Sequence, residues 1–185
     1  MKLRDLSKMY SNNDGTRTLF ESIPVIEVGQ TLADWIKNCP SDKCVLIGGM
    51  AVSYHAKPRV TMDVDLLFLS AHDIPTQVLG FKRTRTGAFQ HNITHVEVEV
   101  ITSALINNLP ITIIQKVFET AIESNGIKIA SPSGLVALKL YRMSKYDEGD
   151  IWVLIETGKV DLTDWSLPPD KLEIYNNIVQ RIKNS

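Results

Sequence analysis

The chain has 185 residues, of which 44% are apolar and 22% charged, and its formal charge at pH 7 is −1. This composition excludes an intrinsically disordered chain, and the near-zero net charge argues against a broad electrostatic footprint for duplex nucleic acid. We therefore expect a single domain that spans residues 1–185.

Cysteine and histidine usage argues against a disulfide or zinc fold. The two cysteines, Cys39 and Cys44, and the four histidines match no zinc-binding spacing, and we expect both cysteines to remain thiols. No apolar run approaches the length of a membrane span, and the charges of Lys2 and Arg4 stand where a signal peptide has its apolar core. We expect a cytoplasmic protein without a membrane partner.

The N-terminal part, residues 1–42, is predicted to be an arm followed by a helix. Residues 7–18 are polar and rich in turn formers, and a helix is expected around Thr31 to Asn38. Residues 43–109 are predicted to form a small mixed sheet. Its elements are a strand from Cys44 to Ile47, a helix from Met50 to Ala56, a strand from Thr61 to Leu69 and a hairpin from Gly87 to Ile101.

The C-terminal part, residues 110–185, is predicted to be mostly helical. A helix is expected from Pro110 to Glu123, then a short strand from Ile127 to Ala130. Ser131 and Pro132 provide an N-cap and a first-turn proline for a helix that runs to about Lys145. The predicted fold class is α/β, in the α+β sense, with a small mixed sheet flanked by helices.

A pair of glycines, Gly48 and Gly49, separates the first predicted strand from the helix that follows. Glycines at this point let a ligand approach the backbone, and the unpaired N–H groups of a helix start suit a phosphate. The alternative interpretation is a tight turn with no ligand, and it is the commoner one for an isolated glycine pair.

Two aspartates stand two residues apart in an otherwise apolar strand. Asp63 and Asp65 therefore point to one face, with α-carbons roughly 6.6 Å apart, close enough for both carboxylates to reach one divalent ion or an adjacent pair. A polar strand face in water is the alternative. The strongly apolar surroundings of the two acids favour a metal site.

Glu97 and Glu99 alternate with valines in the second arm of the predicted hairpin. Three carboxylates around two Mg²⁺ ions are what in-line phosphoryl transfer requires, and either glutamate is a candidate for the third. The alternative is that both belong to the solvated face of a hairpin.

A lysine, Lys139, lies on or beside the apolar face of its predicted helix. It either extends to water or reaches an anion such as a triphosphate, and Arg142, one turn on, is able to share either role. Asp147 and Asp150 follow at helical spacing and form either an acidic motif or an exposed acidic edge.

These segments together resemble the nucleotidyltransferase superfamily that includes DNA polymerase beta, and within it the AbiEii/AbiGii-type toxin nucleotidyltransferases. The resemblance covers residues 44 to 157 in pieces. Its specific part is Gly48-Gly49 followed by R-x-T-x-D-x-D at Arg59, Thr61, Asp63 and Asp65, and its later part runs from Ala130 through Lys139 to Asp150.

The resemblance implies a palm-type sheet that binds a nucleoside triphosphate (NTP) with two Mg²⁺ ions and transfers its NMP to a hydroxyl. By position, Gly48 and Gly49 would cradle the phosphates, and Arg59 and Lys139 would face them. The metal ligands and catalytic carboxylates would be Asp63, Asp65 and Glu99, and Asp147 with Asp150 would form the C-terminal motif. The implied acceptors are a tRNA 3′ end or a protein, and a cognate antitoxin is an implied partner.

The alternative function is a catalytically degenerate palm that binds a nucleotide or a protein without turnover. It is suggested by Glu99, where the family commonly has Asp, and by Tyr146, where the family usually has Lys or Arg before the first aspartate of its C-terminal motif.

Overall fold

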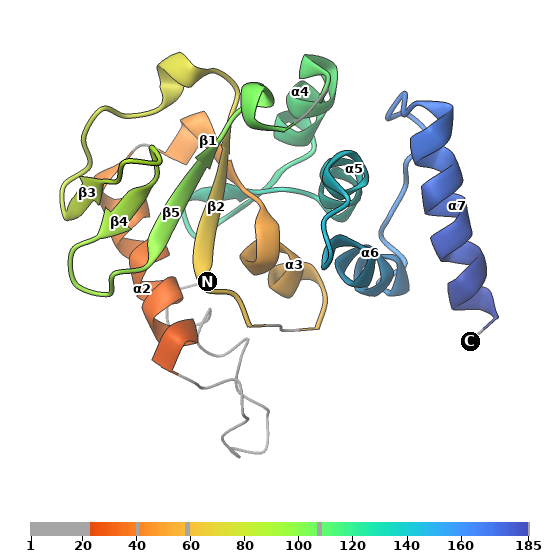
Figure 1. The fold of residues 1–185 in the computed structure, drawn as a ribbon, viewed down its shortest axis with the longest axis horizontal. Helices are drawn as coiled ribbons and strands as arrows, with labels where there is room; N and C mark the ends of the chain where they lie inside the picture. The colour runs from red at the N-terminus through yellow and green to blue at the C-terminus, as the bar shows by residue number, and fades with distance from the viewer. Residues whose placement is uncertain (1–22, 40, 58–59, 107–108, 185) are drawn as a thin grey trace.

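The computed structural model describes residues 23–39, 41–57, 60–106 and 109–184. Within these residues the fold is mixed α/β, with seven strands in one mixed sheet and six α-helices around it (Figure 1). The predicted α+β fold class is therefore confirmed. The predicted arm at residues 7–18 and the predicted phosphate ligand Arg59 lie outside the described residues.

The elements follow one another in mixed order along the chain. The strands are β1 (Cys44–Leu46), β2 (Asp63–Phe68), β3 (Phe81–Arg83), β4 (Phe89–His91), β5 (Glu97–Ile101), β6 (Ile122–Ser124) and β7 (Ile127–Ile129). The helices are α2 (Ile23–Asn38), α3 (Gly48–His55), α4 (Ile111–Glu119), α5 (Pro132–Arg142), α6 (Asp147–Glu156) and α7 (Pro169–Lys183). Short 3₁₀ turns lie at Ser41–Lys43, Ala71–Asp73 and Ser103–Leu105.

The sheet has the strand order β3-β4-β5-β2-β1-β7-β6. The central strand β2 pairs in parallel with β5 and antiparallel with β1, which in turn pairs in parallel with β7. Both parallel pairs lie at the centre of the sheet, whereas the outer pairs are antiparallel. This order places β2 beside β5 and close to the start of α3, which directly follows β1.

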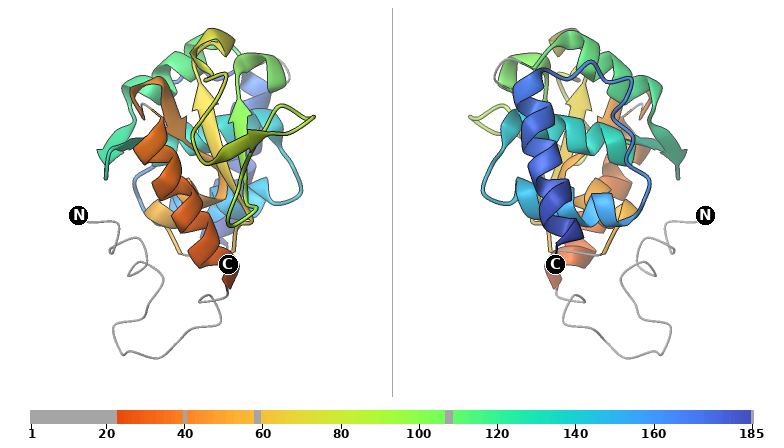
Figure 2. Two further views of the ribbon diagram at one scale, coloured as in Figure 1. Left: turned by 90° about the vertical axis from the view of Figure 1, so that its left-hand side faces the viewer. Right: turned by 90° about the vertical axis from the view of Figure 1, so that its right-hand side faces the viewer.

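Helices pack around the sheet, and α5, α6 and α7 lie together on one side of the molecule (Figure 1). Helix α2 contacts β2, and its Trp35 ring packs edge-on against the rings of Phe81 and Phe89. Helix α5 contacts α3, α4 and α6, and α7 packs against α5 and α6. In the right-hand view of Figure 2, α7 is the blue helix nearest the viewer. Five of the six residues of β2 are buried, so the acids in this strand are held by a rigid central element.

The start of α5 agrees with its sequence signals. Ser131 is the N-cap, its hydroxyl accepts a hydrogen bond from the Gly134 N–H at 3.2 Å, and Pro132 fills the first turn. The helix ends at Arg142 because Met143 adopts a left-handed conformation with φ 43°. The predicted end at Lys145 is thus three residues too late.

The predicted helix from Pro110 to Glu123 is wrong at its C-terminal end. Helix α4 stops at Glu119, and β6 pairs with β7 across a two-residue turn at Asn125 and Gly126. Both turn residues have positive φ, 53° and 79°, as a type I′ hairpin turn requires. The Asn-Gly dipeptide was the available signal for this hairpin.

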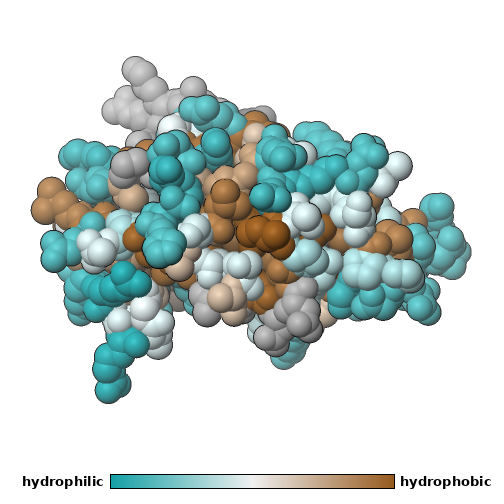
Figure 3. All heavy atoms as spheres, turned by 90° about the horizontal axis from the view of Figure 1, so that it is seen from above, coloured by the Kyte–Doolittle hydropathy of each residue, from teal (hydrophilic) through white to brown (hydrophobic). Residues whose placement is uncertain are grey.

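None of the helices in the described part of the chain is long and apolar enough to cross a membrane. Seen from above, the surface is mostly polar at its margins, with apolar residues gathered in the middle (Figure 3).

Candidate active site

The parallel pairing of β2 and β5 brings four carboxylates onto one face of the sheet. Asp63 is the register partner of Glu97, and Asp65 is the partner of Glu99. Residues two apart in a strand share a face, and paired strands lie about 4.8 Å apart. The four acids predicted from two separate segments are therefore neighbours, with Glu97 and Glu99 both beside the aspartate strand.

Asp65 lies directly against the glycine turn that starts α3. A Cβ atom at Gly48 would lie 1.6 Å from Asp65 Oδ2, and Gly48 has a φ of +66°, so only glycine fits this position. The Ile47 N–H also donates to the Asp65 carbonyl oxygen at 3.0 Å, which ties the turn to β2. Gly49 is buried in the first turn of α3.

The pKa values of two carboxylates are raised. Burial raises the pKa of Asp65 to about 6, and the charges of Asp63 and Glu99 add to the rise, while Arg142 and Lys139 oppose it. Burial also raises the pKa of Glu99, with the charges of Asp63 and Glu97 in support. Ionised acids this close together carry unfavourable energy that a bound cation would relieve.

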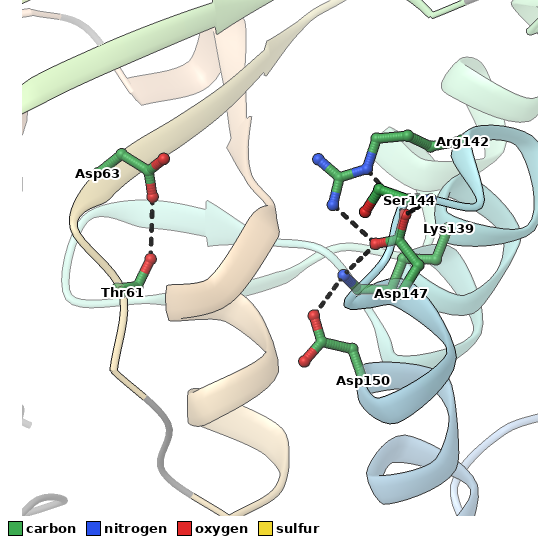
Figure 4. Close-up of polar contacts among 7 residues, drawn as sticks. All are labelled: Thr61, Asp63, Lys139, Arg142, Ser144, Asp147 and Asp150. Carbon is green, nitrogen blue, oxygen red and sulfur yellow. Dashed lines mark hydrogen bonds and ion pairs between the residues drawn. The ribbon is translucent and has the colours of Figure 1, made fainter.

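Asp63, the other aspartate of β2, is oriented by a residue two positions earlier in the chain. The Thr61 hydroxyl donates to Asp63 Oδ1 at 2.9 Å, as Figure 4 shows. Thr61 is the threonine of the R-x-T-x-D-x-D pattern, and this hydrogen bond gives it a role as an orienting residue that the sequence left unassigned.

A buried ion-pair network lies across from β2, at the junction of α5 and α6 (Figure 4). Lys139 Nζ lies 3.0 Å from Asp147 Oδ1 and 2.6 Å from Asp150 Oδ2, and all three residues are buried. Lys139 therefore has two carboxylate partners of its own. Asp147 and Asp150 are buried partners in this network, not an exposed acidic edge.

Arg142 joins this network from its half-exposed position. Its Nε donates to Asp147 Oδ2 at 3.0 Å and one Nη to Asp147 Oδ1 at 2.7 Å, a two-point pairing. Burial alone would raise the pKa of Asp147, but hydrogen bonds from Arg142, the Ser144 N–H and Lys139 hold it well below its usual range. The pairing uses Arg142 Nε and one Nη, and no described residue accepts a hydrogen bond from the other Nη.

The carboxylates and the cations face each other across one cleft. The main cleft has a volume of about 590 Å³, and its lining includes Gly48, Asp65, Glu97, Glu99, Lys139 and Arg142. Arg83, from β3, adds a third cationic residue to the lining. An anion in this cleft would lie between the glycine turn and the α5 cations.

A second depression lies beside the same acids. This acidic hollow has a volume of about 330 Å³ and shares Glu97 and Glu99 with the main cleft. Its other lining residues are Glu27, Met62, Asp63, Thr94, His95 and Val96. Thr94 is fixed there because its hydroxyl lies 2.9 Å from His91 Nδ1, and His91 Nε2 lies 3.4 Å from Asp34.

The donor set fits a hard divalent cation such as Mg²⁺, which prefers carboxylate oxygens. As the side chains stand, no group of three or more His, Cys, Asp or Glu within the described ranges is arranged so that it could hold a metal ion. Asp63 instead accepts a hydrogen bond from Thr61, and Asp65 packs on Gly48. The register of β2 and β5 places Asp65 beside Glu99, with Asp63 two residues earlier in β2 on the same face.

Comparisons with known proteins add no assignment: no family model matches this chain, and no curated protein matches it significantly.

Proposed function

We propose that this protein is a Mg²⁺-dependent nucleotidyltransferase that moves an NMP from an NTP to a hydroxyl acceptor. The observation that carries the proposal is the pairing of Asp65 with Glu99 on neighbouring parallel strands, directly beside Gly48 and opposite Arg142. Acids, a glycine turn at a helix N-terminus and cations together are the parts that phosphoryl transfer requires.

Asp63, Asp65 and Glu99 would hold the metal. When bound, Mg²⁺ would neutralise charge on the phosphates and lower the pKa of the attacking hydroxyl. The raised pKa of Asp65 supports this assignment, because an acid that is costly to ionise alone is stabilised by a cation. Thr61 would keep Asp63 turned toward its ligand position.

The triphosphate would occupy the main cleft. No side-chain cap hydrogen bond is made at the start of α3, so the N–H groups there, at the positive end of the helix dipole, would be available to a phosphate. Arg142 is half exposed and has an Nη group outside its pairing with Asp147, so it would contact the phosphates directly. Lys139 would act mainly by holding Asp147 and Asp150, and through them Arg142.

In the reaction, the acceptor oxygen forms a bond to the α-phosphorus while the bridging bond between the α-phosphorus and the β-phosphate oxygen breaks. The electron pair of that bond leaves with pyrophosphate, and the hydroxyl proton passes to solvent water. The cleft supplies alignment and charge stabilisation, which provide most of the catalysis in this class of reaction.

The test is pyrophosphate release from each of the four NTPs with Mg²⁺, in the presence of total tRNA and of a protein extract as acceptors. We expect release with at least one NTP for the wild type, and at least a hundredfold less for Asp65→Asn. Asp73→Asn is the matched control, because Asp73 lies at the surface beside Lys43 at 3.7 Å. Equal release by wild type and Asp65→Asn would contradict the proposal.

One observation favours the alternative of a degenerate palm that binds without turnover. Lys139 Nζ is already paired with two buried carboxylates, which is how a structural ion pair is built. This alternative predicts that Mg²⁺ with a non-hydrolysable NTP analogue binds in calorimetry, while no NTP is turned over with any acceptor.

A further inference from the structure

The main cleft reaches from α5 to the edge strand β3. Lys139 and Arg142 line it from α5, and Arg83 lines it from β3, which lies three strands away from β2 in the sheet. Neighbouring strands are about 4.8 Å apart, so β3 lies roughly 14 Å from β2. Figure 1 shows β3 and α5 on opposite sides of β2 and β5. A nucleotide whose phosphates lie at Gly48 and Arg142 therefore has room for its base toward Arg83.

The charge of Arg83 acts away from the carboxylates. Arg142 acts to lower the pKa of both Asp65 and Glu99, whereas Arg83 is not among the described groups whose charges shift the pKa of Glu99. The metal and phosphate end of the cleft thus has its cations from α5. Arg83 is the one cationic residue in the described lining of the cleft that the proposed reaction leaves without a role.

The Arg83 guanidinium is held in place and keeps donors for a ligand. It lies over the ring of the buried Phe89, 5.1 Å from the ring centroid, and its Nη1 donates to the Pro75 carbonyl oxygen at 3.3 Å. Arginine carries five N–H donors in a planar fork, and no other described residue accepts a hydrogen bond from this one. The remaining N–H groups are available to a molecule in the cleft.

An apolar wall lines the same cleft. It is formed by three isoleucines, Ile74, Ile101 and Ile106. Ile101 is the last residue of β5, and the other two directly follow the 3₁₀ turns that come after β2 and β5. The cleft volume of about 590 Å³ is in the range of small-molecule sites, which combine apolar walls with a few polar groups that fix orientation. A nucleobase, with apolar faces and a polar edge, fits this combination.

We propose that Arg83 selects the nucleotide by its base, and that the preferred base has two hydrogen-bond acceptors side by side, as guanine and cytosine do. This inference rests on the proposed function and specifies its nucleotide. Guanine presents O6 beside N7, and cytosine presents O2 beside N3. Adenine has no two acceptors side by side, and uracil has an N–H between its two carbonyl groups. A guanidinium donates two parallel hydrogen bonds and accepts none, so it pairs with the first two bases and not with the other two.

The test measures the binding of four nucleotides to the full chain. Non-hydrolysable analogues of GTP, CTP, ATP and UTP are titrated in calorimetry with Mg²⁺. Arg83→Met removes the donors and Arg83→Lys keeps the charge without the planar fork. Arg85→Met is the matched control, because Arg85 is exposed in the same hairpin and does not line the main cleft.

We expect the wild type and Arg85→Met to bind the analogue of GTP or of CTP about tenfold more tightly than those of ATP and UTP. Both Arg83 variants should lose this preference and still bind the ATP and UTP analogues as the wild type does, which a misfolded variant would not do. Arg142→Met, at the phosphate end, should weaken the binding of all four alike. If GTP is preferred, its 7-deaza form, which lacks the N7 acceptor, should bind no better than ATP.

Three results would overturn the inference. They are a wild type that binds all four nucleotides equally, a preference that survives in Arg83→Met, and an equal loss of all four in that variant, which would make Arg83 a phosphate ligand. Each of these leaves the proposed function standing, because the protein still binds Mg²⁺-NTP. Binding of none of the four would overturn the proposed function and this inference with it.

Discussion

Replacing Asp65 with asparagine should stabilise the protein while abolishing its activity. Burial and the charges of Asp63 and Glu99 raise the pKa of Asp65 from its ordinary 3.8 to about 6. A shift of roughly 2 units corresponds to about 3 kcal/mol of folding free energy that the ionised carboxylate removes at pH 8. Asparagine has nearly the same shape as aspartate and carries no charge, so Asp65→Asn should recover up to that amount.

The pH dependence of this gain follows from the direction of the shift. Between pH 4 and 6 the folded state keeps a proton that the unfolded state has released, so the wild type loses stability as the pH rises through this window. The gain from Asp65→Asn should therefore be full above pH 6, fall to about 1 kcal/mol at pH 4.5, and vanish at lower pH.

Urea denaturation of wild type and variants at pH 8 and pH 4.5, without divalent cation, measures the effect. Asp73→Asn, which removes a surface carboxylate 3.7 Å from Lys43, should change stability by only about 0.5 kcal/mol at either pH. Adding Mg²⁺ with an NTP analogue should stabilise the wild type and not Asp65→Asn. A loss of stability in Asp65→Asn at pH 8, or an equal gain at both pH values, would refute the reasoning.

Three further predictions concern glycine, the buried lysine and the thiols. Gly48→Ala should lower the unfolding free energy by about 3 kcal/mol more than Gly158→Ala does. The two glycines have φ values of 66° and 68°, but only Gly48 has an atom, Asp65 Oδ2, where the Cβ would lie. Equal losses of unfolding free energy would contradict this contact. Lys139→Met should lower the unfolding free energy by about 3 to 5 kcal/mol, because it removes a buried cation that pairs with two buried aspartates, whereas Lys183→Met at the exposed end of α7 should have little effect. A loss under 1 kcal/mol would show that the pair is not structural. Cys44 is buried and burial raises its pKa to about 12, so a maleimide should label it at pH 8 only in denaturant; rapid labelling of the native protein would contradict its burial.

The sequence predicted the acids of the site better than their partners. The alternation of Asp63 and Asp65 with apolar residues in β2 predicts both a buried strand and a shared face, because a strand has a two-residue period. The same period predicts the polar face of β5. That β5 lies parallel to β2, in a register that pairs Asp65 with Glu99, depends on long-range packing and is absent from the local pattern.

The α5–α6 network was harder to predict. Helical spacing places Lys139 and Arg142 on one side of α5, but the bend after Met143 that folds α6 back depends on one residue in the left-handed conformation. Only this bend brings Asp147 to within 3.0 Å of Lys139 Nζ. The β3 strand was missed for a similar reason, since three residues of mixed polarity give no periodic signal.

The most direct test of the carboxylate site is a crystal structure of the protein with a non-hydrolysable NTP analogue and Mn²⁺ in place of Mg²⁺, with the anomalous signal of manganese recorded. We predict manganese between Asp63, Asp65 and Glu99, with the triphosphate extending past Gly48 toward Arg142. Manganese bound elsewhere, or a nucleotide seated away from the main cleft, would contradict the account.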